Sequence, residues 1–326
     1  MKRRALLIGA GLAGLGLAPL LRAQDPAASW PSKTVRLIIP FSPGGSTDFQ
    51  GRILCDWLGR HFGQQFVIDH KPGAGSNIGV AELARSAPDG YTLGWITVAS
   101  HAINPTLYAK MPFDHLRDFA PVSMTGTFPN LLVVNNSLPV RTVQDLILLL
   151  KKEPGKYAFA SSGQGTSLHL SGEMFKAMTG TDMLHIPYKG GGPALTDVIG
   201  GQVHMTFGNM PTVIAQARAG KVRPIAVTSL ERWFTAPDIP TIAETVPGYQ
   251  AMSWHGVAFP AATPPSIVDK LSLAIQRAMA TSDLQEKYAA GGSKATAMTP
   301  QQFAAFIRED TERWAPVIRV SGARVE

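Results

Sequence analysis

Apolar strand-like runs alternate with helical segments along almost the whole chain, and no other feature limits the possible folds as much. Residues 35–39 form a short run rich in branched apolar side chains. They are followed at 47–61 by a segment whose apolar residues recur at helical spacing. Pro88-Asp89-Gly90 marks the turn before a further strand at 91–96. Strands that alternate with helices in this way predict an α/β fold with largely parallel sheets.

A second series of the same kind begins after Pro129, and helices are expected from Pro265 and Pro300, since proline can occupy a first helical turn. The other expected strands are at 66–68, 131–134, 157–160, 184–187, 203–207, 225–228 and 253–259, and the other expected helices at 78–85, 142–152, 193–199 and from 166. Roughly 300 residues exceed what one core comfortably accommodates, so we expect two lobes.

The first two dozen residues have the layout of a secretory signal peptide. Met1-Lys2-Arg3-Arg4 is cationic, residues 5–21 carry no charge, and Ala23 offers a cleavage point. We therefore expect 1–23 to be a cleaved signal and the remaining chain to reside in the periplasm. The apolar stretch is marginal for a membrane span. Arg3-Arg4 suggests the twin-arginine route, but such a pair is common by chance, so Sec export stays an alternative.

The same segment imitates a nucleotide-binding motif. Gly9-Ala10-Gly11-Leu12-Ala13-Gly14 satisfies G-x-G-x-x-G, a motif that needs a strand before it and an amphipathic helix after it. Cationic residues precede the motif here, and Pro19 interrupts the segment that follows. We therefore expect no dinucleotide cofactor.

The charge of the chain gives little information about its partners. The full sequence has a net charge of +7, but four of its 30 basic residues lie in the expected signal and none of its 23 acidic residues does, which leaves about +3. No basic run with interleaved aromatic residues is present. This balance does not support binding to nucleic acid.

The sequence lacks the motifs of the common catalytic classes. Cys55 is the only cysteine and lies among apolar neighbours, so no intramolecular disulfide forms. No serine occupies a G-x-S-x-G turn, and the eight histidines show no H-E-x-x-H or H-x-H spacing. We expect no enzyme, no metal and no cofactor. The alternative is a secreted enzyme that uses Gly-rich loops to hold a phosphate or nucleotide, but it would lack the P-loop lysine.

Two loops share one design, in which a strand leads through glycine and hydroxyl residues into a helix. The loops are Phe41-Ser42-Pro43-Gly44-Gly45-Ser46-Thr47-Asp48 and Ser161-Ser162-Gly163-Gln164-Gly165-Thr166-Ser167-Leu168-His169. Such a loop exposes unpaired amides at the positive end of the helix dipole and binds anions without a cationic side chain. One loop is a weak signal. Two loops, one in each lobe, predict a cleft for a ligand with a carboxylate at each end.

Three features near these loops have competing interpretations. Asp48 either stabilises the helix dipole from the first turn, which we favour, or hydrogen-bonds a ligand group. His169 is the best single candidate for a functional imidazole, but capping or packing beside its own loop is the more ordinary role. A third loop, Gly73-Ala74-Gly75-Ser76, could line the cleft, although turn formation alone explains it.

Further blocks of sequence, together with the two loops, carry a family resemblance. They are Trp30-Pro31-Ser32-Lys33, Pro88-Asp89-Gly90-Tyr91-Thr92-Leu93, Asp118-Phe119-Ala120-Pro121-Val122-Ser123, His185-Ile186-Pro187-Tyr188-Lys189-Gly190, Gly200-Gly201-Gln202-Val203, Ile225-Ala226-Val227-Thr228-Ser229 and Pro300-Gln301-Gln302-Phe303. In these blocks, and in their order, the chain resembles the Bug/TctC family of extracytoplasmic solute receptors of tripartite tricarboxylate transporters.

The resemblance implies a periplasmic binding protein fold of type 2, in which two Rossmann-like lobes close on the ligand. Lobe 1 would comprise 30–128 plus 252–326 and lobe 2 would comprise 129–251, with crossings near 122–133 and 251–259. The implied function is capture of a small di- or tricarboxylate, aromatic ones included, by a monomer that delivers it to membrane permease subunits. The alternative role is a receptor that reports its ligand to a two-component system.

The resemblance also adds residues to the expected site. Position for position, Ser100, Asn104, Tyr188 and Asn209 should face the cleft. Many relatives carry an acid where this chain has Gly208, and its absence favours a plain or aromatic dicarboxylate over an amino acid. The complete expected ligand-binding set is Phe41, Gly44, Gly45, Ser46, Asp48, Ser100, Asn104, Ser162, Gly163, Thr166, His169, Tyr188, Gly208 and Asn209.

Overall fold

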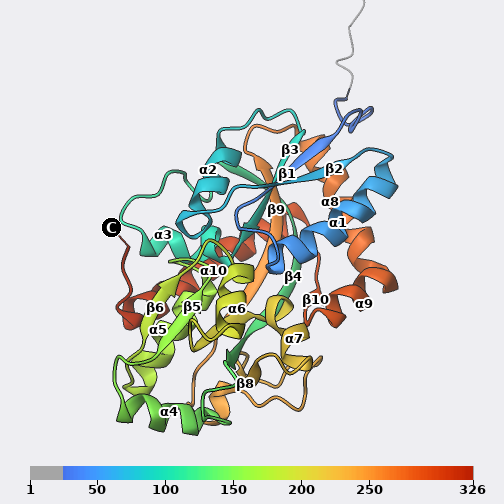
Figure 1. Ribbon diagram of the computed structural model, residues 1–326. Helices are drawn as coiled ribbons and strands as arrows, with labels where there is room; N and C mark the ends of the chain where they lie inside the picture. The colour runs from blue at the N-terminus through green and yellow to red at the C-terminus, as the bar shows by residue number, and fades with distance from the viewer. Residues whose placement is uncertain (1–24, 326) are drawn as a thin grey trace, which may run out of the picture.

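The computed structural model of the chain describes residues 25–325 and has strands and helices that alternate along the sequence (Figure 1). The expected signal peptide, 1–23, lies outside the described residues, so the signal and its cleavage point stay predictions. Within the described part, no helix combines the length and the apolar character that crossing a membrane requires.

The strands of the first group are parallel, and the strand in the middle of this group comes first in the sequence. β1 (Val35–Ile39) pairs with β2 (Phe66–His70) on one side and with β3 (Thr92–Thr97) on the other. The connections run through α1 (Ser46–Phe62), the 3-10 turn η1 (Ala74–Ser76) and α2 (Asn77–Ala84). Four of the five residues of β1 are buried, because helices cover both faces of a parallel strand.

The second group repeats this arrangement. β5 (Ala158–Ser161) pairs in parallel with β6 (Leu184–Pro187) and β7 (Met205–Asn209). The helices of this group are α4 (Val143–Lys152), α5 (Ser167–Thr179), α6 (Gly191–Ile199) and α7 (Met210–Arg218), and β8 (Arg223–Val227) follows them. The pattern of the sequence predicted all of these elements except α7.

Two long antiparallel strands join the groups into one sheet. β4 (Phe119–Val134) pairs first with β9 (Met252–Pro260), which itself pairs with β3, and then with β7 and β8. The strand order is β2-β1-β3-β9-β4-β7-β5-β6, with the short β10 (Lys294–Ala295) on β4. The expectation of largely parallel pairing therefore holds within each group and is wrong for the strands that join them.

β4 is also much longer than the strand predicted at 131–134. Pro121 and Pro129 lie inside it, and proline is a poor predictor of a strand because it cannot donate a ladder hydrogen bond. Pro121 lies next to a register shift in the pairing of β4 with β9. At such a shift one strand has an extra residue and the regular series of backbone hydrogen bonds is interrupted, so the missing N–H of proline is tolerated.

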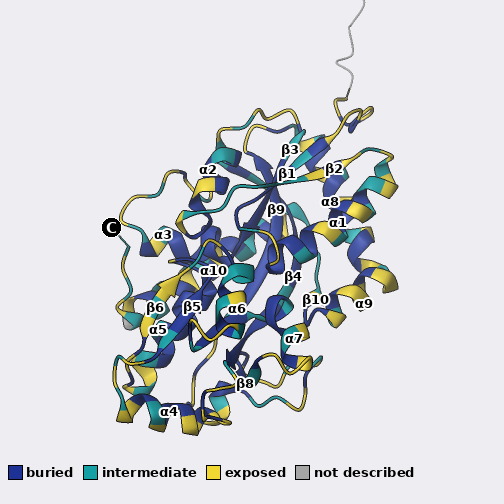
Figure 2. Ribbon diagram, in the orientation of Figure 1, coloured by how far each residue is buried: buried dark blue, intermediate teal, exposed yellow. Residues whose placement is uncertain are grey.

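The last part of the chain returns to the first group. α8 (Pro265–Ala280) and α9 (Ser282–Ala290) lie beside α1 in Figure 1, and α10 (Pro300–Ser321) crosses behind β4 and packs against both groups. Pro265 and Pro300 each begin a helix, as predicted. Figure 2 shows that the central strands are buried and that the surrounding helices expose only their outer faces. Short helical segments are η2 (Ala99–Ile103), α3 (Asn104–Leu107) and η3 (Ile242–Glu244).

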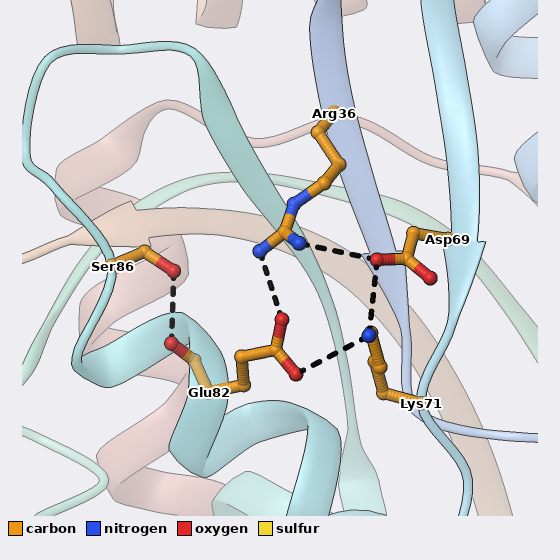
Figure 3. A network of polar contacts seen from close by, with 5 residues as sticks. All are labelled: Arg36, Asp69, Lys71, Glu82 and Ser86. Carbon is orange, nitrogen blue, oxygen red and sulfur yellow. Dashed lines mark hydrogen bonds and ion pairs between the residues drawn. The ribbon is translucent and has the colours of Figure 1, made fainter.

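A network of charged side chains fastens α2 to the edge of the first group (Figure 3). The Arg36 guanidinium reaches Asp69 at 3.1 Å and Glu82 at 2.9 Å, and the Lys71 amine lies 3.5 Å from Asp69 and 3.8 Å from Glu82. Each of these side chains is about one-third exposed, so every single pair contributes little to stability. The network fixes where α2 lies, and with it the η1 turn at its N-terminus.

Candidate functional site

A cavity lies between the two strand groups, against the middle of the sheet. Its volume is about 20 Å³, so its walls nearly meet. Its walls come from the loops before α1, α5 and α6, from the ends of β3 and β7, and from β9. The lining residues are Phe41, Gly45, Ser46, Thr47, Thr97, Val98, Ala99, Ser162, Thr166, Ser167, Leu168, Gly191, Asn209, Ser253, Trp254 and His255.

The N-terminus of α1 forms one wall. Gly45 is the N-cap residue in an extended conformation, and no side chain accepts from the first-turn amides. Ser46 and Thr47, in that first turn, both line the cavity. The first amides of a helix lack partners within it and carry partial positive charge. This wall therefore offers hydrogen-bond donors to an anion.

Asp48 holds the same loop from behind. Its carboxylate accepts from the Gly44 amide at 3.1 Å and lies 3.0 Å from the Arg52 guanidinium and 3.1 Å from Nε2 of His70. The other ring nitrogen of His70 is 2.8 Å from the carbonyl of Phe41. Burial opposes ionisation of Asp48, but the Gly44 amide and Arg52 hold its pKa below the ordinary value. Asp48 thus holds the loop before α1 through the Gly44 amide, and both its role toward the helix dipole and its contact with a ligand stay predictions.

The loop before α5 forms the opposite wall. Thr166 is the N-cap, and its hydroxyl donates to the carbonyl of Gly163 at 2.7 Å, which keeps the loop tight. Ser162, Thr166 and Ser167 line the cavity. His169 lies beneath the loop instead, where its Nδ1 accepts from the Gly165 amide at 3.3 Å. This is the local packing role that the sequence offered as the ordinary alternative.

A third helix N-terminus reaches the cavity, which the sequence analysis did not predict. α6 begins after Gly190, no side chain caps it, and Gly191 in its first turn lines the cavity. The run Gly190-Gly191-Gly192-Pro193 was a usable signal, because glycines followed by proline are typical of a helix start that something approaches closely.

Asn209 connects the walls to one another. Its side-chain carbonyl accepts from the Ser46 hydroxyl at 3.1 Å, and its amide donates to Asn130 at 2.7 Å, Ser253 at 3.1 Å and Ser167 at 3.3 Å. The side chain therefore ties α1 to β4, β9 and α5. A polar network of this kind is fully engaged only when both strand groups are close together.

Other contacts also join the two strand groups. The Ser42 amide donates to the carbonyl of Lys189 at 3.0 Å, and the Tyr108 hydroxyl donates to the carbonyl of Gln164 at 3.3 Å. The η1 turn packs so closely on the α5 loop that a Cβ added to Gly75 would overlap the carbonyl oxygen of Gln164. Gly75 thus lies at the boundary between the groups and outside the cavity lining.

Six of the fourteen predicted residues line the cavity: Phe41, Gly45, Ser46, Ser162, Thr166 and Asn209. Gly44, Asp48, Gly163 and His169 belong to the supporting loops. As ligand contacts, all fourteen remain predictions.

The four remaining predicted residues have other partners. Ser100 is buried and bonds the backbone of Thr97, and Asn104 donates to the carbonyl of Gly75 at 3.0 Å. The Tyr188 hydroxyl donates to Asp197 at 2.6 Å, and burial together with this bond raises the pKa of Tyr188 to about 12. Gly208 lies in β7, and a Cβ added to it would meet Val213 of α7, so that helix fills the space beside this glycine.

The electrostatics of the cavity are set by dipoles. No lining residue is Lys, Arg, Asp or Glu.

Thr97 and His255 are polar lining residues that the sequence analysis missed, because nothing in a strand pattern marks which polar residue faces a cavity. The Thr97 hydroxyl is buried and has no hydrogen-bond partner. Over residues 25–325, no group of three or more His, Cys, Asp or Glu side chains is arranged to hold a metal ion.

The chain is similar in sequence to a known protein family and to individual proteins of that family. A profile of the tripartite tricarboxylate transporter family receptor matches residues 51–323. Protein BugT of Bordetella pertussis is 37% identical over 328 positions, which cover 100% of this chain and 99% of BugT.

Two solved structures share the fold. An R. palustris protein with adipate is 38% identical, has a TM-score of 0.89, and is matched over 91% of this chain and 100% of its own. MatC from Rhodopseudomonas palustris, with bound malate, is 28% identical with a TM-score of 0.85, over 89% of this chain and 100% of its own. The fold class expected from the sequence is confirmed by these matches.

Proposed function

This chain belongs to the tripartite tricarboxylate transporter receptor family, a family of solute-binding receptors, and we propose that it captures a small di- or tricarboxylate in the periplasm. Delivery to the membrane permease subunits of such a transporter follows from the same proposal. Two relatives of the same fold were solved with adipate and with malate, both dicarboxylates, which supports this ligand class.

The single observation that carries the proposal is the composition of the cavity wall. The first turns of α1 and α6 face it without a capping side chain, and hydroxyl side chains of the α5 loop face it from the second group. Helix N-termini bind carboxylates through their amides and dipoles. A ligand with two carboxylates engages donors from both groups, whereas a monocarboxylate engages one.

Closure of two lobes is part of the proposal. Lobe 1 comprises 30–128 plus 252–326 and lobe 2 comprises 129–251, with β4 and β9 as the crossings. The contacts of Ser42 with Lys189 and of Tyr108 with Gln164 are then contacts of the closed state. A ligand favours this state only through contacts that the open state lacks. The donors of α6 and of Asn209 supply such contacts, since they meet α1 across the cavity.

Titration calorimetry of the purified protein tests the ligand class. We expect adipate and malate to bind, and acetate, butyrate and aspartate to bind at least about tenfold more weakly, the effect of losing about 1.4 kcal/mol. Failure of every dicarboxylate to bind would contradict the proposal.

A matched pair of variants tests the site. Gly45→Val places a branched side chain between the N-termini of α1 and α6, where a Cβ meets the Gly191 amide nitrogen at 3.6 Å, and should weaken dicarboxylate binding about tenfold or more. Gly200→Val is the control, since Gly200 is exposed at the end of α6 with an ordinary φ of −73°. Equal loss of affinity in both variants would count against the proposed site.

A further inference from the structure

The floor of the cavity contains a chain of buried polar side chains to which no role has been assigned. His255 on β9 lies 2.9 Å through Nδ1 from the side-chain carbonyl of Gln50 on α1, and the Gln50 amide donates to the Ser293 hydroxyl at 2.8 Å. All three residues are at most 2% exposed. Polar groups this deeply buried are normally paired, and here each pairing constrains the next.

The chain of bonds fixes which nitrogen of His255 carries its proton. Because the Gln50 amide is engaged by Ser293, Gln50 presents its carbonyl oxygen to His255, and a carbonyl oxygen only accepts. Nδ1 is therefore protonated, and Nε2 is the unprotonated nitrogen that remains for a ligand. The ring cannot turn over easily, since it meets Trp95 and Phe128 edge to face at centroid distances of 5.6 and 4.7 Å.

Nε2 of this imidazole accepts hydrogen bonds and cannot donate one. Burial lowers the pKa of His255 to about 3, so the ring is uncharged at neutral pH. A carboxylate placed against Nε2 would bring two acceptors together, which the buried site could not compensate. The ligand group that satisfies Nε2 is a hydrogen-bond donor.

A neighbouring side chain points to the same group. Thr97 pairs with His255 across β3 and β9, and directly opposed residues in an antiparallel pair lie on the same face. Both line the cavity, and the Thr97 hydroxyl, 3% exposed, has no partner. One ligand O–H between them could donate to Nε2 and accept from Thr97.

We propose that His255 is a specificity-determining residue, which selects ligands that present an O–H group to its Nε2. The inference rests on the proposed function and narrows the ligand to a dicarboxylate with a hydroxyl group between its ends. The O–H group could also come from the undissociated carboxyl of a singly protonated dicarboxylate. The two kinds of O–H donor make the affinity respond differently to pH.

The test compares pairs of ligands that differ by one hydroxyl group. Malate against succinate and 3-hydroxyadipate against adipate are titrated by calorimetry into the wild-type protein and into His255→Phe and His255→Gln. The wild type should bind the hydroxylated member of at least one pair about tenfold more tightly, because a site built to bond a hydroxyl rejects the analogue without it. His255→Phe, whose ring suits the aromatic surroundings, should bind both members equally. His255→Gln, whose side-chain carbonyl can accept, should keep part of the preference.

The controls separate this inference from the proposed function. His101→Phe makes the same change at a histidine that is equally buried and lies outside the cavity, and it should keep the wild-type preference. If none of the four compounds binds, the proposed function itself is wrong. If they bind but the wild type shows neither a preference for the hydroxylated member nor an affinity that falls with rising pH, or if His255→Phe behaves as the wild type does, the role of His255 is overturned.

The pH arm identifies the source of the O–H. If plain dicarboxylates bind as tightly as hydroxylated ones, and their affinity falls about tenfold per pH unit above the second pKa of the ligand in the wild type but not in His255→Phe, the donor is the ligand's own carboxyl. Affinity that is independent of pH, together with a preference for the hydroxylated member, assigns the donor to the hydroxyl.

Discussion

His169 and His185 form a stacked pair under the loop that precedes α5. Their ring centroids are 4.1 Å apart, and His185 also stacks on Phe159. Burial, together with the nearby Lys176, lowers the pKa of His169 to about 4, and burial followed by His169 lowers that of His185 to about 3. Since Nδ1 of His169 accepts from the Gly165 amide, protonation at that nitrogen would remove a bond that holds the loop.

This pair predicts how stability depends on pH. The folded state keeps both rings neutral while the unfolded chain protonates them below the ordinary pKa of 6.5. The stabilisation is therefore complete above pH 6.5 and is lost as the pH falls toward the folded values, at about 1.4 kcal/mol per pH unit for each ring. His185→Phe should keep the stack on Phe159 and reduce the slope of stability against pH by the contribution of one ring, about 1.4 kcal/mol per pH unit.

Urea unfolding curves collected between pH 4 and pH 6.5 measure the slope directly. The matched control is His61→Phe, an exposed position where the ring stacks on Trp57, which should leave the slope unchanged. An unaltered slope in His185→Phe would show that this ring is not kept neutral by the fold.

At the scale of elements, glycines at helix starts and turns let the two strand groups approach each other. Gly75 in η1 has φ 58°, and its Cα lies close to the α5 loop. Gly180, which ends α5, has a similar φ of 62° but nothing within 4 Å of an added Cβ. The two positions thus share the same backbone strain and differ only in what a methyl group would meet.

Gly75→Ala should therefore hold the groups apart, whereas Gly180→Ala should not. Each variant is expected to lose about 1–2 kcal/mol of stability from the left-handed backbone. Only Gly75→Ala should also weaken dicarboxylate binding and abolish the decrease in radius of gyration that the proposed closure predicts for small-angle scattering with ligand. Normal compaction of Gly75→Ala would contradict the closed-state assignment of this contact.

Local sequence patterns predicted some of these elements and missed others. The branched run of β1 and the prolines of α8 and α10 are local signals, and the structure has elements where they point. α7 was missed because it begins directly after β7, with no turn residue between Asn209 and Met210 to mark a boundary. The length of β4 was missed because Pro121 and Pro129 argue locally against a strand, whereas pairing with β9 and β7 decides the outcome.

At the scale of the whole molecule, the cavity exists only because distant parts of the chain meet. Ser46, Asn209 and Ser253 are joined by hydrogen bonds although more than 200 residues separate the first from the last. The Gly/Ser loops could be recognised from local sequence because each is a helix start. Thr97 and His255 could not, since their roles depend on which face of a strand reaches the cavity. The resemblance added Asn209, but its pairing with Ser46 is visible only in the structure.

The central claim is that helix N-termini from both strand groups hold a dicarboxylate without any cationic side chain. A crystal structure of the protein with bound malate tests it most directly. We predict carboxylate oxygens within about 3.2 Å of first-turn amides or hydroxyls of α1 and of the α5 or α6 start, with no Lys or Arg side chain in contact. A carboxylate held by Lys or Arg, or malate bound outside the cavity, would contradict the account.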